Sequence, residues 1–251
     1  MHIYAKAFQL QKGGNKPAEY EDAFWPSHLD EDGTTFRFAV ADGATETSFA
    51  GVWAKLLVRA YAKGTLELPT SSDALAVLSE RWRSVVGRKP LPWYAEEKVR
   101  LGASATFLGL TLESPAETPG TIRWRATAFG DSCVFQVRGD NLLSGLPVER
   151  SADFNNEPPL LSSGPANNRR LAEHLIVREG EARPEDAFYL MTDALACWFW
   201  ASYEKGEWPW QLLRDLDTSD QACPFPAFIE SLRKSKLIRN DDVTVLRLEI
   251  G

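Results

Sequence analysis

The sequence predicts an α+β fold in which antiparallel β-sheets carry helices on their outer faces. Segments that alternate apolar and polar residues recur along the chain, which is typical of antiparallel strands with one covered face. Between them lie segments with the 3.6-residue apolar spacing of amphipathic helices. Because no repeat, low-complexity tract or linker separates two cores, we expect a single domain over residues 1–251.

The strand predictions rest on period-two alternation. In "TFRFAVAD" (35–42) the large apolar side chains stand at every second position, and the segment ends in Asp42-Gly43. The same reasoning predicts further strands at 104–113, 121–131, 132–137, 186–193 and 241–250. The tetrapeptide "RGDN" (138–141) predicts a hairpin turn directly after the predicted strand at 132–137.

The helix predictions rest on apolar spacing and on breakers. Apolar residues recur at helical spacing from Phe49 to Tyr61, and Gly64 can end that helix. Further helices are predicted at 71–86, 93–101, 194–204, 208–215 and 225–236. Two spans rich in Ser, Asn, Pro and Gly, 113–120 and 144–170, are predicted to be loops.

Composition excludes several classes of protein. The 28 basic and 35 acidic residues give a net charge of −7, which disfavours nucleic acid or an anionic membrane surface as a partner. No apolar run has the length of about 18 residues that a membrane helix needs, and the first residues lack the order of a signal peptide. The three cysteines are Cys133, Cys197 and Cys223. Their odd number predicts free thiols and a cytoplasmic location.

Aspartates stand at the ends of several predicted strands. They are Asp22, Asp42, Asp131, Asp193 and Asp241. Taken singly, Asp42-Gly43 suits a turn, Asp193 a helix cap and Asp241 a solvated strand start. Taken together, they could converge on one edge of a sheet sandwich. The three histidines are too scattered for a histidine-rich zinc site.

The motifs around these aspartates resemble those of the PPM-type (protein phosphatase 2C) metal-dependent protein serine/threonine phosphatases, bacterial type. In chain order they are "YEDAF" (20–24), "VADGAT" (40–45), "GASAT" (102–106), "FGDS" (129–132), "LMTDALA" (190–196) and "NDDVTVL" (240–246). The resemblance covers residues 20–250. It implies a four-layer αββα sandwich of two antiparallel β-sheets flanked by helices.

The resemblance also implies a metal site. The matching positions are Glu21, Asp22, Asp42, Gly43, Asp131, Asp193 and Asp241. Asp42 matches the carboxylate that bridges two ions, and the carbonyl of Gly43 matches a ligand of one of them. Asp193 and Asp241 match the remaining direct carboxylate ligands.

Three further acidic positions complete the implied site. Glu21 and Asp22 match the pair that holds metal-bound waters. Asp131 matches a residue of a third, weaker metal site in bacterial members.

Chemistry explains why such a site needs so many carboxylates. Clustered aspartates repel one another, and each resists ionisation unless a cation neutralises the group. Oxygen ligands favour Mn²⁺ or Mg²⁺ over zinc. Two such ions, with a possible third, can activate a water that attacks phosphorus directly. Asp22 and Lys16 are the predicted catalytic residues.

The sequence departs from the family pattern near the substrate. Pro17 stands where many members have an arginine that binds the phosphate, and Lys16 or Lys12 is the candidate replacement. Lysine offers a point charge where arginine offers a fork of donors. Tyr20, Cys133 and Ala194 also replace family residues. The span 144–170 occupies the place of a flap beside the active site, and a plain surface loop is an equal alternative.

The expected function is hydrolysis of phosphoserine and phosphothreonine in proteins that a Ser/Thr kinase has modified, by a monomeric enzyme. A catalytically weak or inactive phosphatase-like binding module is the alternative, because the arginine is lost and 197–210 is rich in tryptophan. A small-molecule phosphohydrolase on the same scaffold is a third option.

Overall fold

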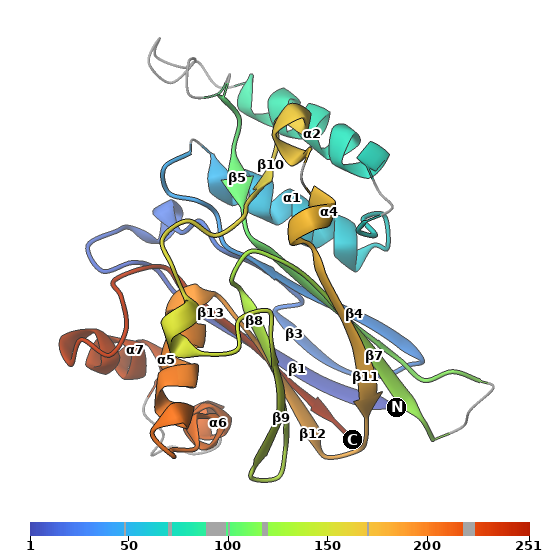
Figure 1. Cartoon of the computed structure of the whole chain (residues 1–251), viewed down its shortest axis with the longest axis vertical. Helices are drawn as coiled ribbons and strands as arrows, with labels where there is room; N and C mark the ends of the chain where they lie inside the picture. Colours follow the sequence, from blue (N-terminus) through green and yellow to red (C-terminus); the bar gives the residue numbers. More distant parts are fainter. Residues whose placement is uncertain are drawn as a thin grey trace.

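The computed structural model describes residues 1–47, 49–69, 72–88, 99, 101–116, 120–169, 171–217 and 224–251. Two antiparallel sheets dominate the fold (Figure 1). The six-stranded sheet has the order β3 (His28–Asp32), β1 (His2–Leu10), β13 (Val243–Ile250), β12 (Asp186–Met191), β8 (Cys133–Arg138) and β9 (Asn141–Leu146). The five-stranded sheet has the order β11 (Ile176–Ala182), β7 (Ile122–Phe129), β6 (Phe107–Glu113), β4 (Thr35–Ala41) and β2 (Ala23–Trp25).

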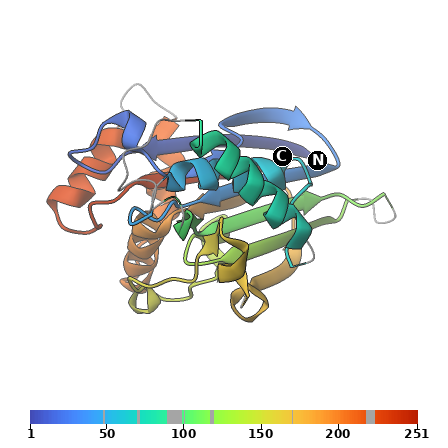
Figure 2. The ribbon, with the colours of Figure 1, turned by 90° about the horizontal axis from the view of Figure 1, so that it is seen from above.

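The two sheets face each other across an apolar core. Period-two alternation sends every second side chain of a strand to this core, as the burial of Phe38 and Val40 on β4 and of Leu246 and Leu248 on β13 shows. The first and last strands pair with each other in one sheet. The termini therefore lie close together, as the view from above shows (Figure 2).

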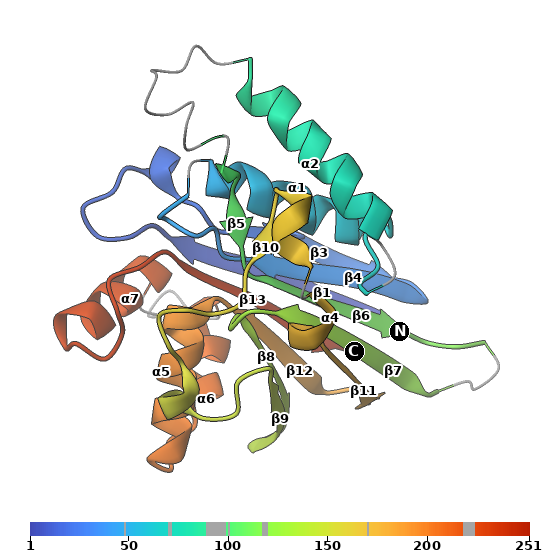
Figure 3. The same cartoon turned by 45° about the horizontal axis from the view of Figure 1, so that its top comes forward.

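Helices cover the outer face of each sheet. The helices α1 (Ala50–Ala62) and α2 (Ser72–Val86) pack on the five-stranded sheet through a second buried cluster. The helices α5 (Asp193–Glu204), α6 (Pro209–Arg214) and α7 (Phe225–Lys234) pack on the six-stranded sheet through a third. Figure 3 shows the two groups of helices on opposite sides of the sheets. The α+β fold, a four-layer αββα sandwich, is confirmed.

Short elements connect these layers. They are the strands β5 (Ser104–Ala105) and β10 (Leu161–Ser162), which pair with each other, the helix α4 (Leu171–His174), and the 3₁₀ turns η1 (Pro17–Glu19), η2 (Ser151–Asp153), η3 (Pro165–Asn168) and η4 (Asp215–Asp217). The span 144–170 therefore contains the end of β9, β10 and two 3₁₀ turns, so the prediction of a plain loop there was incomplete. No helix in the described part of the chain is long and apolar enough to cross a membrane.

Most element predictions agree with the structure. The six predicted strands and the helices that correspond to α1, α2, α5, α6 and α7 are present, with ends shifted by a few residues. The predicted hairpin is present, because β8 pairs with β9 through Arg138 and Asn141. Sequence reasoning gave no bounds for β1, β3 and β11. The helix predicted at 93–101 lies almost wholly outside the described residues.

Candidate functional site

Four of the predicted site aspartates line one pocket of about 200 Å³: Asp42, Asp131, Asp193 and Asp241. They come from different parts of the fold. Asp42 follows β4, whereas Asp131 lies in the turn from β7 of one sheet to β8 of the other. Asp193 begins α5 directly after β12, and Asp241 precedes β13. The structure therefore brings together carboxylates that are up to 199 positions apart in the sequence.

Close backbone packing fixes the first of these carboxylates. The Asp42 amide donates to Thr106 Oγ1 over 3.1 Å, and the Thr106 amide donates to the Asp42 carbonyl over 2.9 Å. A Cβ on Gly43 would lie 2.8 Å from the carbonyl oxygen of Glu21 and 2.9 Å from the backbone of Ala50. Glycine at this position therefore lets the motifs at 20–24 and 40–45 pack in contact with the start of α1.

The acidic pair at 21–22 lies beside this pocket without lining it. Asp22 is buried, and its Oδ2 accepts hydrogen bonds from Thr244 Oγ1 over 2.6 Å and from Thr192 Oγ1 over 3.1 Å. The Glu21 amide donates to Asp242 Oδ2 over 2.7 Å. Sequence reasoning missed these supporting groups, although Asp242 and both threonines stand inside the quoted motifs.

Burial and mutual repulsion weaken the acidity of this cluster. Burial, with repulsion by Asp242, raises the pKa of Asp22 to about 7 despite the hydroxyl hydrogen bonds. Burial raises the pKa of Asp131 to about 6. Burial and the nearby Asp22, Asp241 and Asp131 raise the pKa of Asp42 well above its usual range. The pKa of Glu21 is also raised, mainly by burial.

Several carboxylate oxygens of the cluster lack a donor. Asp22 Oδ1, Asp193 Oδ1 and both side-chain oxygens of Asp131 are buried without a hydrogen-bond partner among the described residues. Buried oxygens of this kind are costly unless a cation or donor satisfies them. The donor set therefore fits a hard divalent cation.

The ligand geometry, in contrast, is not already assembled. Within the described part of the chain, no three His, Cys, Asp or Glu side chains are arranged so that they could hold a metal ion. A visible reason is that Asp193 Oδ2 accepts a hydrogen bond from the guanidinium of Arg239. A metal ion that bound Asp193 through Oδ2 would compete with this guanidinium, whereas Oδ1 has no partner among the described residues.

The basic residues near the site differ from the sequence expectation. Lys16 is exposed and does not line the pocket, so the structure offers its predicted phosphate-binding role no support. The Lys12 ammonium lies 3.9 Å from Asp241 Oδ1. Arg239, which sequence reasoning missed, lines the pocket directly. Its only sequence signal is its position two residues before Asp241.

The described cysteines have no sign of nucleophilic activation. Cys133 is buried and Cys197 is half-buried, and both are free thiols. Burial raises the pKa of each thiol, which favours the unreactive protonated form. Cys223 lies outside the described residues.

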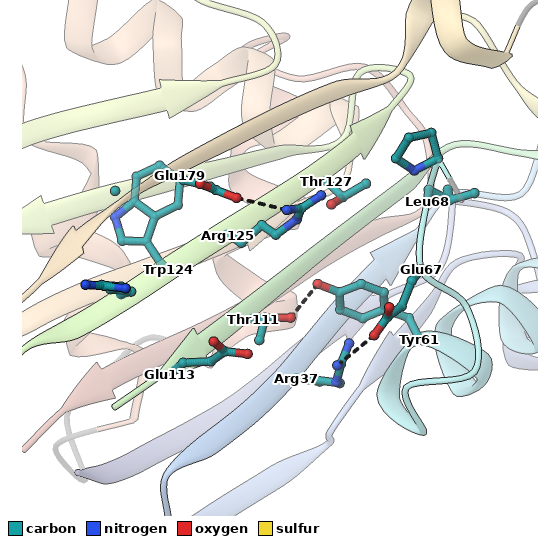
Figure 4. Close-up of a pocket in the computed structure, with 13 residues that line it drawn as sticks. Arg37, Tyr61, Glu67, Leu68, Thr111, Glu113, Trp124, Arg125, Thr127 and Glu179 are labelled. Atoms are coloured by element: carbon teal, nitrogen blue, oxygen red, sulfur yellow. Dashed lines mark hydrogen bonds and ion pairs between the residues drawn. The ribbon is translucent and has the colours of Figure 1, made fainter. Parts of the chain in front are cut away.

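A larger cavity of about 450 Å³ lies on the outer face of the five-stranded sheet (Figure 4). Its charged side chains are largely paired: Arg37 Nη2 lies 3.1 Å from Glu67 Oε1, and Arg125 Nη1 lies 2.9 Å from Glu179 Oε1. Such cross-strand pairs are typical of a solvated sheet face. We therefore place the candidate chemistry in the smaller carboxylate pocket.

Solved structures share this fold. A structure of the Mycobacterium tuberculosis serine/threonine phosphatase PstP/Ppp is 17% identical, with a TM-score of 0.56 over 100% of both chains. The catalytic domain of PstP in complex with two manganese ions is 16% identical, with a TM-score of 0.54 over 99% of both chains. RsbX in complex with magnesium is 18% identical, with a TM-score of 0.52 over 100% of this chain and 96% of RsbX.

Sequence comparison gives the family. No curated protein matches the chain. The family described as protein phosphatase 2C, in contrast, matches residues 17–235, which include four of the five strand-end aspartates and most of the fold. The chain belongs to the protein phosphatase 2C family.

Proposed function

We propose that this protein hydrolyses phosphoserine and phosphothreonine in phosphoproteins with the help of Mn²⁺ or Mg²⁺. The observation that carries the proposal is the convergence of four aspartates from both sheets on one pocket, with buried oxygens that have no donor. Membership of the phosphatase family supports it. The manganese and magnesium in the PstP and RsbX structures support the choice of ions.

The proposed mechanism assigns a role to each part of the site. Asp42, the Gly43 carbonyl, Asp193 and Asp241 would hold two ions, and Asp131 would contribute to a third. When bound, such ions would neutralise charge on the phosphate and lower the pKa of water. Asp22 orients water through Oδ1, since its Oδ2 already accepts hydrogen bonds from three hydroxyls, those of Tyr20, Thr192 and Thr244. Glu21 supports the same water layer.

The test is a phosphatase assay with phosphopeptides, a simple aryl phosphate and a panel of phosphorylated metabolites, each with Mn²⁺, with Mg²⁺ or with EDTA. We expect phosphopeptide hydrolysis only with metal, and loss of turnover in Asp42→Asn. Asp186→Asn is the matched control, because Asp186 is a buried carboxylate outside the pocket. Metal-independent turnover, or full activity of Asp42→Asn, would contradict the proposal. Preference for metabolites would point to a small-molecule phosphohydrolase.

A phosphoprotein-binding module without turnover is the second candidate. The ion pair between Arg239 and Asp193 favours it, because this pair occupies one of the proposed ligand atoms. The tryptophan-rich stretch 197–210 does not add a broad partner surface: Trp198, Trp200 and Trp210 are buried, and Trp208 is exposed. Phosphopeptide binding without hydrolysis in the presence of Mn²⁺ would select this candidate. Cytoplasmic location and a monomeric state stay predictions.

A further inference from the structure

The carboxylate pocket has one basic side chain among the described residues that line it, Arg239. Its guanidinium donates to Asp193 Oδ2 through Nη2, and to Asn156 Oδ1 through Nη1 over 3.2 Å. Asp193 begins α5, and Asn156 belongs to the span 144–170. Arg239 therefore bridges two walls of the pocket.

The backbone that carries Arg239 is anchored, whereas its side chain is partly exposed. The buried Arg233 donates from Nη2 to the Asp241 carbonyl over 2.6 Å and to the Gln11 carbonyl over 3.0 Å. These bonds hold the connection between α7 and β13 in place. The Arg239 side chain, in contrast, is 47% exposed, and its hydrogen-bond partners among the described residues are the Asp193 carboxylate and the Asn156 amide at the pocket.

The positive charge of Arg239 suits it to bind an anion in this acidic pocket. A phosphate monoester is an anion, and four aspartates line the pocket that it must enter. Metal ions neutralise part of this charge, and a guanidinium adds a planar fork of donors that matches two phosphate oxygens. Lys12 is directed to Asp241, and Lys16 does not line the pocket.

Asp193 is both the hydrogen-bond partner of Arg239 and a proposed metal ligand. Its Oδ2 is the acceptor for Arg239, and its Oδ1 is buried without a partner among the described residues. A carboxylate that becomes a metal ligand holds a neighbouring guanidinium less strongly, because the cation has neutralised its charge. The arginine can then turn to another anion in the pocket.

We propose that Arg239 is the phosphate-binding residue of this chain, and that it competes with metal for Asp193 until metal binding transfers its guanidinium to the substrate phosphate. The inference rests on the proposed function, and it adds a residue and an order of events. Since both ligands act through Arg239, binding of metal and binding of phosphate strengthen each other.

The inference predicts opposite effects on the two ligands. In Arg239→Gln, the competing cation is removed, so the affinity for Mn²⁺ in the absence of phosphate should rise about 3- to 10-fold. The affinity of the Mn²⁺-loaded protein for inorganic phosphate should fall about 10- to 100-fold, the range expected for a lost charge-assisted bond. The KM for a phosphopeptide should rise more than kcat falls. Arg239→Lys should restore part of the phosphate affinity.

The experiment is calorimetric titration of the full chain with MnCl₂ alone, and then of the Mn²⁺-loaded protein with inorganic phosphate. The control is Arg125→Gln, an arginine paired with Glu179 on the outer sheet face away from the pocket. It should leave both affinities unchanged. Circular dichroism and thermal unfolding check that each variant folds. A parallel fall in both affinities would indicate a merely structural role and overturn the inference.

The inference and the proposed function fail separately. Hydrolysis by the wild type with unchanged affinities and KM in Arg239→Gln overturns the inference alone. Arg239-dependent phosphate binding without any hydrolysis overturns the proposed function and supports the inference. A wild-type chain that binds neither Mn²⁺ nor phosphate overturns both.

Discussion

The two ends of β12 carry buried carboxylates that differ in how completely hydrogen-bond donors satisfy them. At its start, Asp186 accepts hydrogen bonds from Arg138 over 2.6 and 2.8 Å and from Gln136 over 2.9 Å. Burial alone would raise the pKa of Asp186, but these donors lower it overall. Just past the end of the strand, Asp193 keeps one oxygen without a partner among the described residues. Burial therefore does not distinguish the two carboxylates, whereas the supply of donors does.

The difference separates a carboxylate whose oxygens are satisfied within the fold from one that is left partly unsatisfied. The Asp186 cluster is complete without any ligand, so it contributes to folding. The carboxylates around Asp193 leave charge and lone pairs unsatisfied, which costs folding free energy and creates affinity for a cation. Perturbed carboxylates in a pocket are therefore the ones expected to take part in chemistry.

Turnover should give the largest difference between the two ends of the strand. Asp193→Asn removes a proposed metal ligand, which is worth several kcal/mol in transition-state stabilisation. We expect kcat/KM with Mn²⁺ to fall at least about 100-fold, since each factor of ten corresponds to about 1.4 kcal/mol. Asp186→Asn should change it less than about threefold. Steady-state kinetics at a temperature where both variants are folded checks this, and similar losses would break the comparison.

Folding stability should change in opposite directions. Asp186→Asn removes charge-assisted hydrogen bonds from a buried site and should lower the free energy of unfolding by about 2–3 kcal/mol. Asp131→Asn removes a buried charge without a donor and should raise it by about 1 kcal/mol in EDTA at pH 7.5. Urea unfolding measures both. A loss of stability in Asp131→Asn would show that its carboxylate has donors after all.

The free energy of unfolding should depend on pH in opposite ways for the carboxylate cluster and for Asp186. The pKa of Asp22 is about 7 and that of Asp131 about 6 in the folded chain, both above the unfolded value of about 3.9. Between these values the folded state holds protons that the unfolded state has released. The free energy of unfolding in EDTA should therefore fall as the pH rises from about 5 to 7.5, by up to about 1.4 kcal/mol per pH unit for each proton.

Controls for this dependence come from the carboxylate cluster and from the start of β12. Asp22→Asn should flatten the slope, and saturating Mn²⁺ should reverse the loss. Asp186 has a lowered pKa, so its contribution is present above about pH 4 and is lost only as the pH falls further. Thermal unfolding across pH in EDTA and in Mn²⁺ measures these effects. A stability that rises from pH 5 to 7.5 in EDTA would contradict the electrostatics of the pocket.

The smallest effect is expected at the exposed ion pairs of the larger cavity. Glu179→Ala breaks the pair with Arg125 on the sheet face (Figure 4). Because both side chains are substantially exposed, the free energy of unfolding should change by less than about 1 kcal/mol. Turnover should stay within about twofold of the wild type in the phosphatase assay. A large loss of turnover would place the functional site in this cavity instead.

Sequence reasoning predicted the sandwich and the gathering of Asp42, Asp131, Asp193 and Asp241, because motif order carries both. The strands with strong alternation were found because period-two alternation is a local signal. It gave no bounds for β3 and β11, since "HLDED" and "IVREGEA" are polar edge strands whose pairing depends on distant partners.

Contacts between distant residues explain the remaining misses. Arg239 and Asp193 are 46 residues apart, and no local pattern indicates that they meet. The same holds for the hydroxyls of Thr192 and Thr244 that bind Asp22. Lys12 and Lys16 were considered because they lie within five residues of Pro17, but proximity in the chain did not bring Lys16 to the pocket.

Residues that adjoin both sheets form the candidate site, so its geometry depends on how the core spaces the two sheets. Asp42 extends from one sheet, while Asp193 and Asp241 adjoin the other. The distance between the proposed ligands is therefore set by the side chains that space the sheets, such as Phe38 and Leu246. A core substitution that touches no proposed ligand would still alter this distance. We therefore expect substitutions at such core positions to lower turnover before they prevent folding.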